Sequence, residues 1–155
     1  MAFINLQCGK LKSNKITLAL IDYFQNYFVV TEFKSKIDGN ESIDDFVAFN
    51  ESLAIAVEIK ITKGDFLKDF RKTKHKIPRE NLYYNKFYFC VPEKIKDFVA
   101  EYLDKNDFRD YGLLFVTDFY SIFKHKDASF FMIDKPLFEI NKDSNKLDKI
   151  AIFIA

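Results

Sequence analysis

The 155-residue sequence has no tryptophan, only two cysteines, no long hydrophobic run and no large excess of either charge. Cys8 and Cys90 lie far apart, and Cys90 falls inside the apolar run 87–91. Two such cysteines argue against a disulfide-stabilised secreted domain, so we expect reduced thiols in a cytoplasmic protein. No run approaches the length of a membrane-spanning helix, and residues 1–8 are too short for the apolar core of a signal peptide. We therefore expect no interaction with a membrane.

The missing tryptophan excludes little, because other aromatic residues are abundant and include 19 phenylalanines. The composition is 48% hydrophobic and 30% charged, which is typical of globular proteins. A chain of this length buries most of its apolar surface as one domain. No internal repeat, low-complexity segment or linker divides the sequence. We therefore predict a single domain over residues 1–155.

The net charge of +1 does not by itself predict nucleic-acid binding, but the distribution of charge does. Eight lysine and arginine residues and two aspartates lie between Lys60 and Arg79, which gives this cationic segment a net charge of +6. The rest of the chain therefore carries −5. Such a local patch attracts a polyanion to one place. A solvated helix face produces the same run of charges, so the pattern alone leaves both interpretations open.

The hydrophobic periodicity predicts a mixture of helices and strands. Apolar residues at helical spacing predict helices over 14–27, 63–75 and 92–103, the last opened by Pro92. Shorter apolar runs predict strands over 28–33, 46–49, 53–61, 86–91, 113–117, 121–123 and 130–133. The apolar tail 147–154 suits either a helix or a strand. The sequence therefore predicts an α/β fold with a mixed sheet.

The stretch 53–61 predicts a strand with one apolar face and one charged pair. Side chains alternate across a strand, so Glu58 and Lys60 point to the same side. The opposite face is apolar throughout and consists of Leu53, Ile55, Val57, Ile59 and Ile61. Charged residues on a buried strand are costly unless they pair or bind a metal ion. An ordinary ion pair within the sheet uses the same two residues and is the alternative to a functional site.

Two aspartates directly before the neighbouring strand are candidates for a second acidic group. A hairpin between the two strands would bring Asp44 or Asp45 close to Glu58. We favour Asp45 because the apolar strand follows it directly.

Carboxylate oxygens suit Mg²⁺ or Mn²⁺, which keep several water ligands and need only one or two carboxylates together with a substrate phosphate. The backbone carbonyl of Ile59 would lie beside such an ion. Lys60 would hold or help to deprotonate the attacking water and offset charge on the phosphate.

Taken together, the spacing of these residues resembles the PD-(D/E)xK nuclease superfamily. The matching residues are Asp45, then Val57-Glu58-Ile59-Lys60, then Thr62, Asp65, Phe66, Asp69, Lys74 and His75, and finally the strand 87–92. The pattern is most similar to the small stand-alone bacterial and phage members, the MmcB-like group linked to DNA repair. The resemblance covers residues 14–117 and is densest over 57–92.

The resemblance implies a restriction-endonuclease-like core, in which a mixed central β-sheet is flanked by helices. It implies a metal-dependent nuclease that hydrolyses DNA phosphodiester bonds in repair, recombination or phage and defence DNA processing. Asp45, Glu58 and Lys60 would be catalytic. The Mg²⁺ or Mn²⁺ ligands would be Asp45, Glu58 and the Ile59 carbonyl, with Asp44 as the alternative aspartate.

The chain departs from the family pattern at two places. The residue before the first aspartate is not proline, and the stretch 13–15 reads Ser-Asn-Lys where many relatives carry a glutamate near the metal. We therefore expect modest activity that favours Mn²⁺.

The cationic segment supplies the candidate nucleic-acid contacts, with DNA as the expected partner. These are Lys63, Lys68, Arg71, Lys72, Lys74 and His75. A structural role is an equal alternative for Lys74 and His75. We expect Asp65 and Asp69 to suit the helix start and pair with nearby lysines, and Tyr83 and Tyr84 to belong to the core.

Two other functions use the same residues. The first is a catalytically inactive DNA-binding or protein-interaction module on the same fold. The second is a structural protein in which Glu58 and Lys60 form an ordinary strand ion pair. The sequence also leaves a protein partner or a homodimer open.

Overall fold

The computed structural model describes residues 11–134 and 152–154, and the structural statements below concern these residues. The helices are α2 (Ser13–Tyr23), α3 (Lys63–Asp69) and α4 (Lys96–Lys105). There are also three short 3₁₀ turns in the described residues, η1 (Thr73–His75), η2 (Arg79–Asn81) and η3 (Glu93–Ile95). The strands are β1 (Phe28–Ile37), β2 (Asn40–Phe49), β3 (Ala54–Ile59), β4 (Lys86–Pro92), β5 (Gly112–Val116), β6 (Ile122–Lys126) and β7 (Ile152–Ile154).

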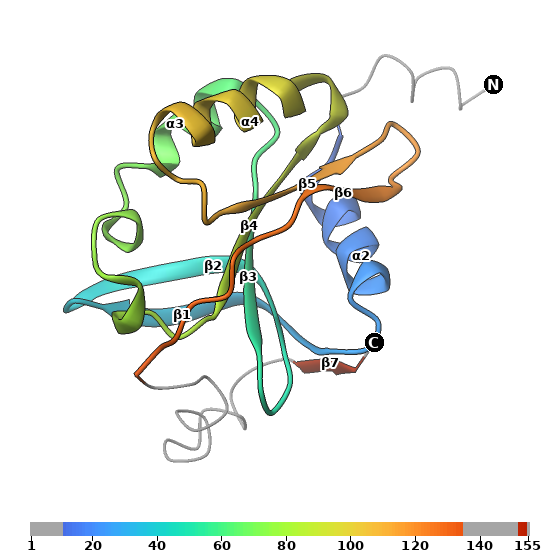
Figure 1. Cartoon of the computed structure of the whole chain (residues 1–155). Helices are drawn as coiled ribbons and strands as arrows, with labels where there is room; N and C mark the ends of the chain where they lie inside the picture. The colour runs from blue at the N-terminus through green and yellow to red at the C-terminus, as the bar shows by residue number, and fades with distance from the viewer. Residues whose placement is uncertain (1–10, 135–151, 155) are drawn as a thin grey trace.

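These strands form one twisted sheet in the order β6-β5-β4-β3-β2-β1-β7 (Figure 1). Strands β3, β4 and β5 run parallel, and every other neighbouring pair is antiparallel. The two parallel steps need crossover connections, and the segments that carry α3 and α4 supply them. The predicted α/β fold with a mixed sheet flanked by helices is confirmed.

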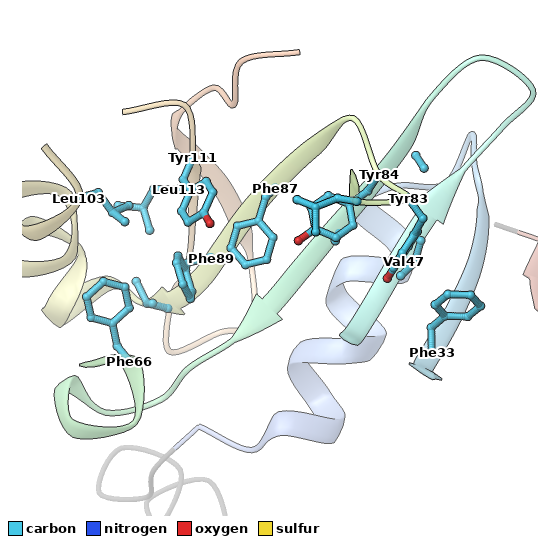
Figure 2. Close-up of a cluster of buried hydrophobic side chains, with 14 of the residues drawn as sticks. Phe33, Val47, Phe66, Tyr83, Tyr84, Phe87, Phe89, Leu103, Tyr111 and Leu113 are labelled. Atoms are coloured by element: carbon cyan, nitrogen blue, oxygen red, sulfur yellow. The ribbon is translucent and has the colours of Figure 1, made fainter. Parts of the chain in front are cut away.

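The two faces of the sheet are covered by different helices (Figure 1). Helix α2 packs Ile16 and Leu20 against one face, beside Val57 of β3. Helices α3 and α4 cover the other face, where Phe66 and Leu103 join a largely aromatic cluster. Figure 2 shows this cluster continuing along the sheet to Phe33, Tyr83 and Tyr84 at its other end. Both tyrosines are buried, as predicted.

Strand β3 is buried along its whole length and separates the two cores. Ile55, Val57 and Ile59 face α2, as the alternation predicts. Ala54 and Ala56 face the α3 side, and the same alternation places Glu58 on that side. The fold therefore puts one carboxylate into the layer between the sheet and α3, where it needs compensation.

The predicted helix over 63–75 is wrong in its second half. Thr62 caps the start of α3, because its hydroxyl accepts the Asp65 backbone N–H at 3.1 Å. The helix ends at Asp69, and the Lys72 N–H closes a tight turn onto the Asp69 carbonyl at 3.0 Å. This turn leads into η1, in which Lys74 and His75 are buried. The polar interactions of these two side chains outweigh local helix propensity.

Strands β1 and β2 are longer than the predicted 28–33 and 46–49, so Asp44 and Asp45 lie inside β2 and not directly before it. Other elements also differ from the sequence-based prediction. Helix α2 ends at Tyr23 rather than at residue 27, and a 3₁₀ turn precedes α4. The segment 130–133 forms no strand, although the Phe131 N–H bonds to the Asn85 carbonyl at 3.0 Å. In the tail, 147–151 lies outside the described residues, and β7 pairs with β1.

The predictions about cysteines and membranes concern different parts of the chain. Cys90 is a buried free thiol in β4, as predicted, whereas Cys8 lies outside the described residues. Among the helices of residues 11–134, none combines the length and apolar character needed to cross a bilayer.

Candidate functional site

The candidate site lies where β2 and β3 separate. Their pairing runs from Phe49 opposite Ala54 to Phe46 opposite Val57 and ends there. Beyond that point, Oδ2 of Asp45 accepts the backbone N–H of Ile59 at 2.9 Å. The Asp45 carboxylate thus accepts an N–H of β3 at the point where the backbone pairing with β2 has ended. This hydrogen bond fixes Asp45 beside the end of β3.

The Glu58 carboxylate lies close enough to Asp45 to affect the ionisation of Asp45. Burial and the charge of the neighbouring Glu58 carboxylate raise the pKa of Asp45 to about 6, against the lowering effect of the Ile59 N–H. An Asp45 carboxylate whose ionisation is disfavoured in this way is stabilised in its charged form by a nearby cation. This is the relation that the sequence predicted between the two residues.

Glu58 is surrounded by lysines. Its Oε1 is 2.7 Å from Nζ of Lys74, and its Oε2 is 3.6 Å from Nζ of both Lys60 and Lys72. Burial lowers the pKa of Lys60, but the Asp69 and Glu58 carboxylates outweigh this effect and raise it overall. The structure therefore brings together Asp45, Glu58 and Lys60, the three residues predicted to be catalytic.

Asp44 has a different environment from Asp45. Nζ of Lys74 lies 2.8 Å from its Oδ1, and the Tyr83 hydroxyl donates a hydrogen bond to its Oδ2. The Asp44 and Lys74 side chains are both fully buried. Both oxygens of Asp44 are thus engaged inside the protein. The geometry therefore favours Asp45 over Asp44 as the partner of Glu58.

Asp69, at the end of α3, completes the group of charges. Its Oδ1 is 2.8 Å from Nζ of Lys72 and 3.0 Å from Nζ of Lys60, and its Oδ2 is 2.6 Å from Nε2 of His75. Burial opposes ionisation of Asp69. The hydrogen bond from His75 and the nearby ammonium groups outweigh it, and they hold the pKa of Asp69 well below its usual range.

The whole group is hereafter called the acid–lysine centre. It consists of Asp44, Asp45, Glu58, Lys60, Asp69, Lys72 and Lys74.

His75 supports the acid–lysine centre from inside the aromatic core. An ionised carboxylate only accepts hydrogen bonds, so Nε2 of His75 donates to Asp69, and Nδ1 accepts the Tyr111 hydroxyl at 2.6 Å. Burial lowers the pKa of His75 and keeps the ring neutral, although Asp69 acts in the opposite direction. The rings of Phe70 and Phe89 lie within 5.0 and 6.0 Å of the imidazole, centre to centre.

The predicted nucleic-acid contacts divide into two groups. Lys63, Lys68, Arg71 and Lys72 have exposed side chains around α3. The prediction is wrong for Lys74 and His75, which are buried and bound to internal partners. The physical reason is that α3 ends at Asp69, so both residues lie in the following turn η1, where their side chains are buried.

The donor set suits a divalent cation that keeps most of its water. In the described part of the chain, no three or more histidine, cysteine, aspartate or glutamate side chains form a ready metal-binding group. Asp45 and Glu58 supply two carboxylates, and the hydrogen bond from the Ile59 N–H holds Asp45 beside the residue that follows Glu58. Mg²⁺ is commonly held by one or two carboxylates with several waters, so these residues fit such an ion.

The sequence analysis gave Asp69 a structural role at α3 and Tyr83 a place in the core, and it identified no role for Tyr111. A usable signal existed for Asp69, because it follows Phe66 by three residues and therefore lies on the same buried face of the helix. Tyr83 and Tyr111 carried no such signal, since their hydroxyls reach polar partners only through long-range packing.

Comparisons with known proteins concern the fold alone. No protein family model and no curated protein matches the chain. The SPO1766 protein of unknown function from Silicibacter pomeroyi is 17% identical, with a TM-score of 0.56, and the match covers 86% of this chain and 83% of that one. An XisH family protein from Nostoc punctiforme is also 17% identical, with a TM-score of 0.45, and covers 70% of this chain and 94% of that one. The first likeness supports the mixed α/β fold described above.

Proposed function

We propose that this protein is a divalent-metal-dependent nuclease that hydrolyses phosphodiester bonds of DNA. DNA repair, recombination, or phage and defence DNA processing are the settings that we propose for it. The observation that supports this proposal most directly is the convergence of Asp45, Glu58 and Lys60 at the point where β2 and β3 separate.

Each residue would have a distinct role in hydrolysis. Asp45 and Glu58 would hold the Mg²⁺ or Mn²⁺ ion with the Ile59 carbonyl, and a bound ion would supply an activated water and polarise the scissile phosphate. The Ile59 N–H fixes one oxygen of Asp45 and orients the other. Lys60, which is 16% exposed, would orient the attacking water and stabilise charge that develops on the phosphate.

The exposed cations around α3 would steer DNA toward this position. Lys63, Lys68 and Arg71 belong to the segment that directly follows Lys60 and β3. Phosphate contacts of this kind supply affinity and orientation without reading the base sequence.

A second function is favoured by one specific observation. Glu58 already has three ammonium groups within 3.6 Å, so its charge is compensated without a metal ion. A module that binds DNA or a protein partner through the same fold, without catalysis, is consistent with this compensation. The two functions differ in what happens to bound DNA.

The test measures cleavage and binding of the same DNA. Wild-type protein is incubated with fluorescently labelled single-stranded and double-stranded DNA in Mg²⁺, Mn²⁺, Ca²⁺ or chelator. We expect cleavage in Mg²⁺ or Mn²⁺ only, and a loss of several orders of magnitude in Glu58→Gln and Lys60→Met.

The matched controls are Glu101→Gln and Lys105→Met, which change an exposed ion pair on α4 and should leave the rate unchanged. Anisotropy should show that Lys60→Met still binds DNA. Binding by the wild type without cleavage in any of these metals would favour the non-catalytic module.

A further inference from the structure

In the acid–lysine centre, Lys60 and Lys72 both lie near the carboxylates of Asp69 and Glu58, but at different distances. Nζ of Lys60 is 3.0 Å from Asp69 but 3.6 Å from Glu58. Nζ of Lys72 is 2.8 Å from Asp69 and again 3.6 Å from Glu58. Both ammonium groups therefore make their closer contact with Asp69, and neither closes a tight ion pair with Oε2 of Glu58.

We propose that Asp69 is a positioning residue, which draws Lys60 and Lys72 away from Oε2 of Glu58 and so keeps that oxygen available for a divalent cation. This inference rests on the proposed function, because the cation is the one that the nuclease would use. It assigns a role to a carboxylate that is neither a metal ligand nor a contact to substrate.

Asp69 is suited to this role because it is held firmly. Its side chain is fully buried, and His75 donates to its other oxygen at 2.6 Å. His75 in turn accepts the Tyr111 hydroxyl and packs among the rings of Phe70, Phe87 and Phe89. A buried carboxylate that is held by a buried histidine keeps its orientation toward the two lysines.

The two lysines differ in freedom. Lys60 is 16% exposed and Lys72 is 43% exposed, so Lys72 is the one that can leave Asp69 for a phosphate in solution. Without Asp69, Glu58 is the carboxylate that remains within 4 Å of both lysines among the described residues. They would then neutralise the residue that must hold the metal ion.

The first measurement needs no metal and no activity. Lysines of wild-type protein and of Asp69→Asn are acetylated under limiting reagent, and the rate at each site is read by mass spectrometry. We expect Lys60 and Lys72 to react faster in the variant, because Glu58 alone then compensates the two ammonium groups that Asp69 and Glu58 share in the wild type, while the exposed Lys68 serves as the reference. Unchanged rates at both sites would overturn the proposal.

The second measurement is the affinity for Mn²⁺ alone, by calorimetry. We expect Asp69→Asn to weaken binding by about 10- to 100-fold, the range found when a group that orients metal ligands is lost. Adding Lys72→Gln to Asp69→Asn should restore most of the affinity, because the displaced ammonium is gone. Adding Lys68→Gln instead should not, which distinguishes a local effect from a change in net charge.

A purely structural role for Asp69 predicts that no lysine substitution rescues Mn²⁺ binding, and that result would overturn the proposal. Absence of Mn²⁺ binding by the wild type would overturn it as well. Should Asp69→Asn not fold, His75→Phe keeps the aromatic packing and removes the hydrogen bond to Asp69, and we expect the same direction of change. If the wild type binds Mn²⁺ and Lys72→Gln rescues binding in Asp69→Asn, but no DNA is cleaved, the result would contradict the proposed nuclease function and leave the role of Asp69 supported.

Discussion

Replacing Lys74 with methionine tests whether this lysine is structural or contacts DNA. Its ammonium lies 2.8 Å from Asp44 and 2.7 Å from Glu58, and its side chain is fully buried. The two carboxylates raise the pKa of Lys74 above its usual value, against the lowering effect of burial. Methionine has a similar shape, so the packing loss should be small and the loss of charge should dominate.

The expected loss of stability depends on the partners that Glu58 and Asp44 keep when Lys74 is replaced. Glu58 keeps Lys60 and Lys72 at 3.6 Å, but Asp44 keeps only the hydroxyl of Tyr83 among its hydrogen-bond and ion-pair partners in the described residues. Removing one partner of a buried pair costs about 3–5 kcal/mol of unfolding free energy. For a domain of this size, that corresponds to a fall in melting temperature of roughly 2–4 °C for each kcal/mol.

The assay is urea unfolding at pH 7, followed by circular dichroism and tyrosine fluorescence. We expect a lower midpoint with an unchanged dependence on urea, which identifies a loss of stability rather than a change in the unfolded state. Lys105→Met, at an exposed ion pair, is the control and should unfold like the wild type. A loss below about 1 kcal/mol, as for surface pairs, would refute the buried role of Lys74.

Three further predictions use other parts of the molecule. The pKa of Asp45 is raised to about 6 in the folded state, so its ionisation lowers the free energy of unfolding as the pH rises from about 4 to 6. Asp45→Asn can still accept the Ile59 N–H. In urea titrations, this variant should show a smaller fall in stability over that pH range and should be more stable than the wild type at pH 7 without metal. Lys63→Ala with Lys68→Ala should weaken DNA binding and reduce the slope of log K against log salt by about 0.9 for each DNA phosphate that these lysines no longer neutralise; an unchanged slope would place the binding surface elsewhere. Burial raises the pKa of the Cys90 thiol to about 12, so iodoacetamide should modify Cys90 only after unfolding, and rapid labelling of the native protein would contradict the described core.

The architecture was largely predictable from sequence because it depends on local patterns. The apolar runs of β3 and β4 and the turn at Asp38-Gly39 are short-range signals, and Gly39 adopts the positive φ that such a turn requires. The convergence of Asp45 and Glu58 was predictable for the same reason, since a hairpin fixes which residues face each other.

The charges around Glu58 were not predictable in this way. Lys74 and Lys72 lie two residues apart in the cationic segment, yet one is buried and the other is partly exposed. Their environments depend on the end of α3 at Asp69 and on Asp44, thirty residues away from Lys74 in sequence. A run of charges indicates net potential, but only tertiary packing decides which charges neutralise one another internally.

The buried position of His75 gives the acid–lysine centre a built-in spectroscopic reporter. The chain has two histidines, and the other, His125, is exposed on β6. The aromatic rings packed around His75 should shift its carbon-bound proton resonances through ring currents more strongly than those of His125, which is exposed and lies 6.4 Å from the Phe115 ring, centre to centre. In nuclear magnetic resonance, the His125 signals can therefore serve as an internal standard, while the His75 signals report changes at Asp69 without any label being introduced.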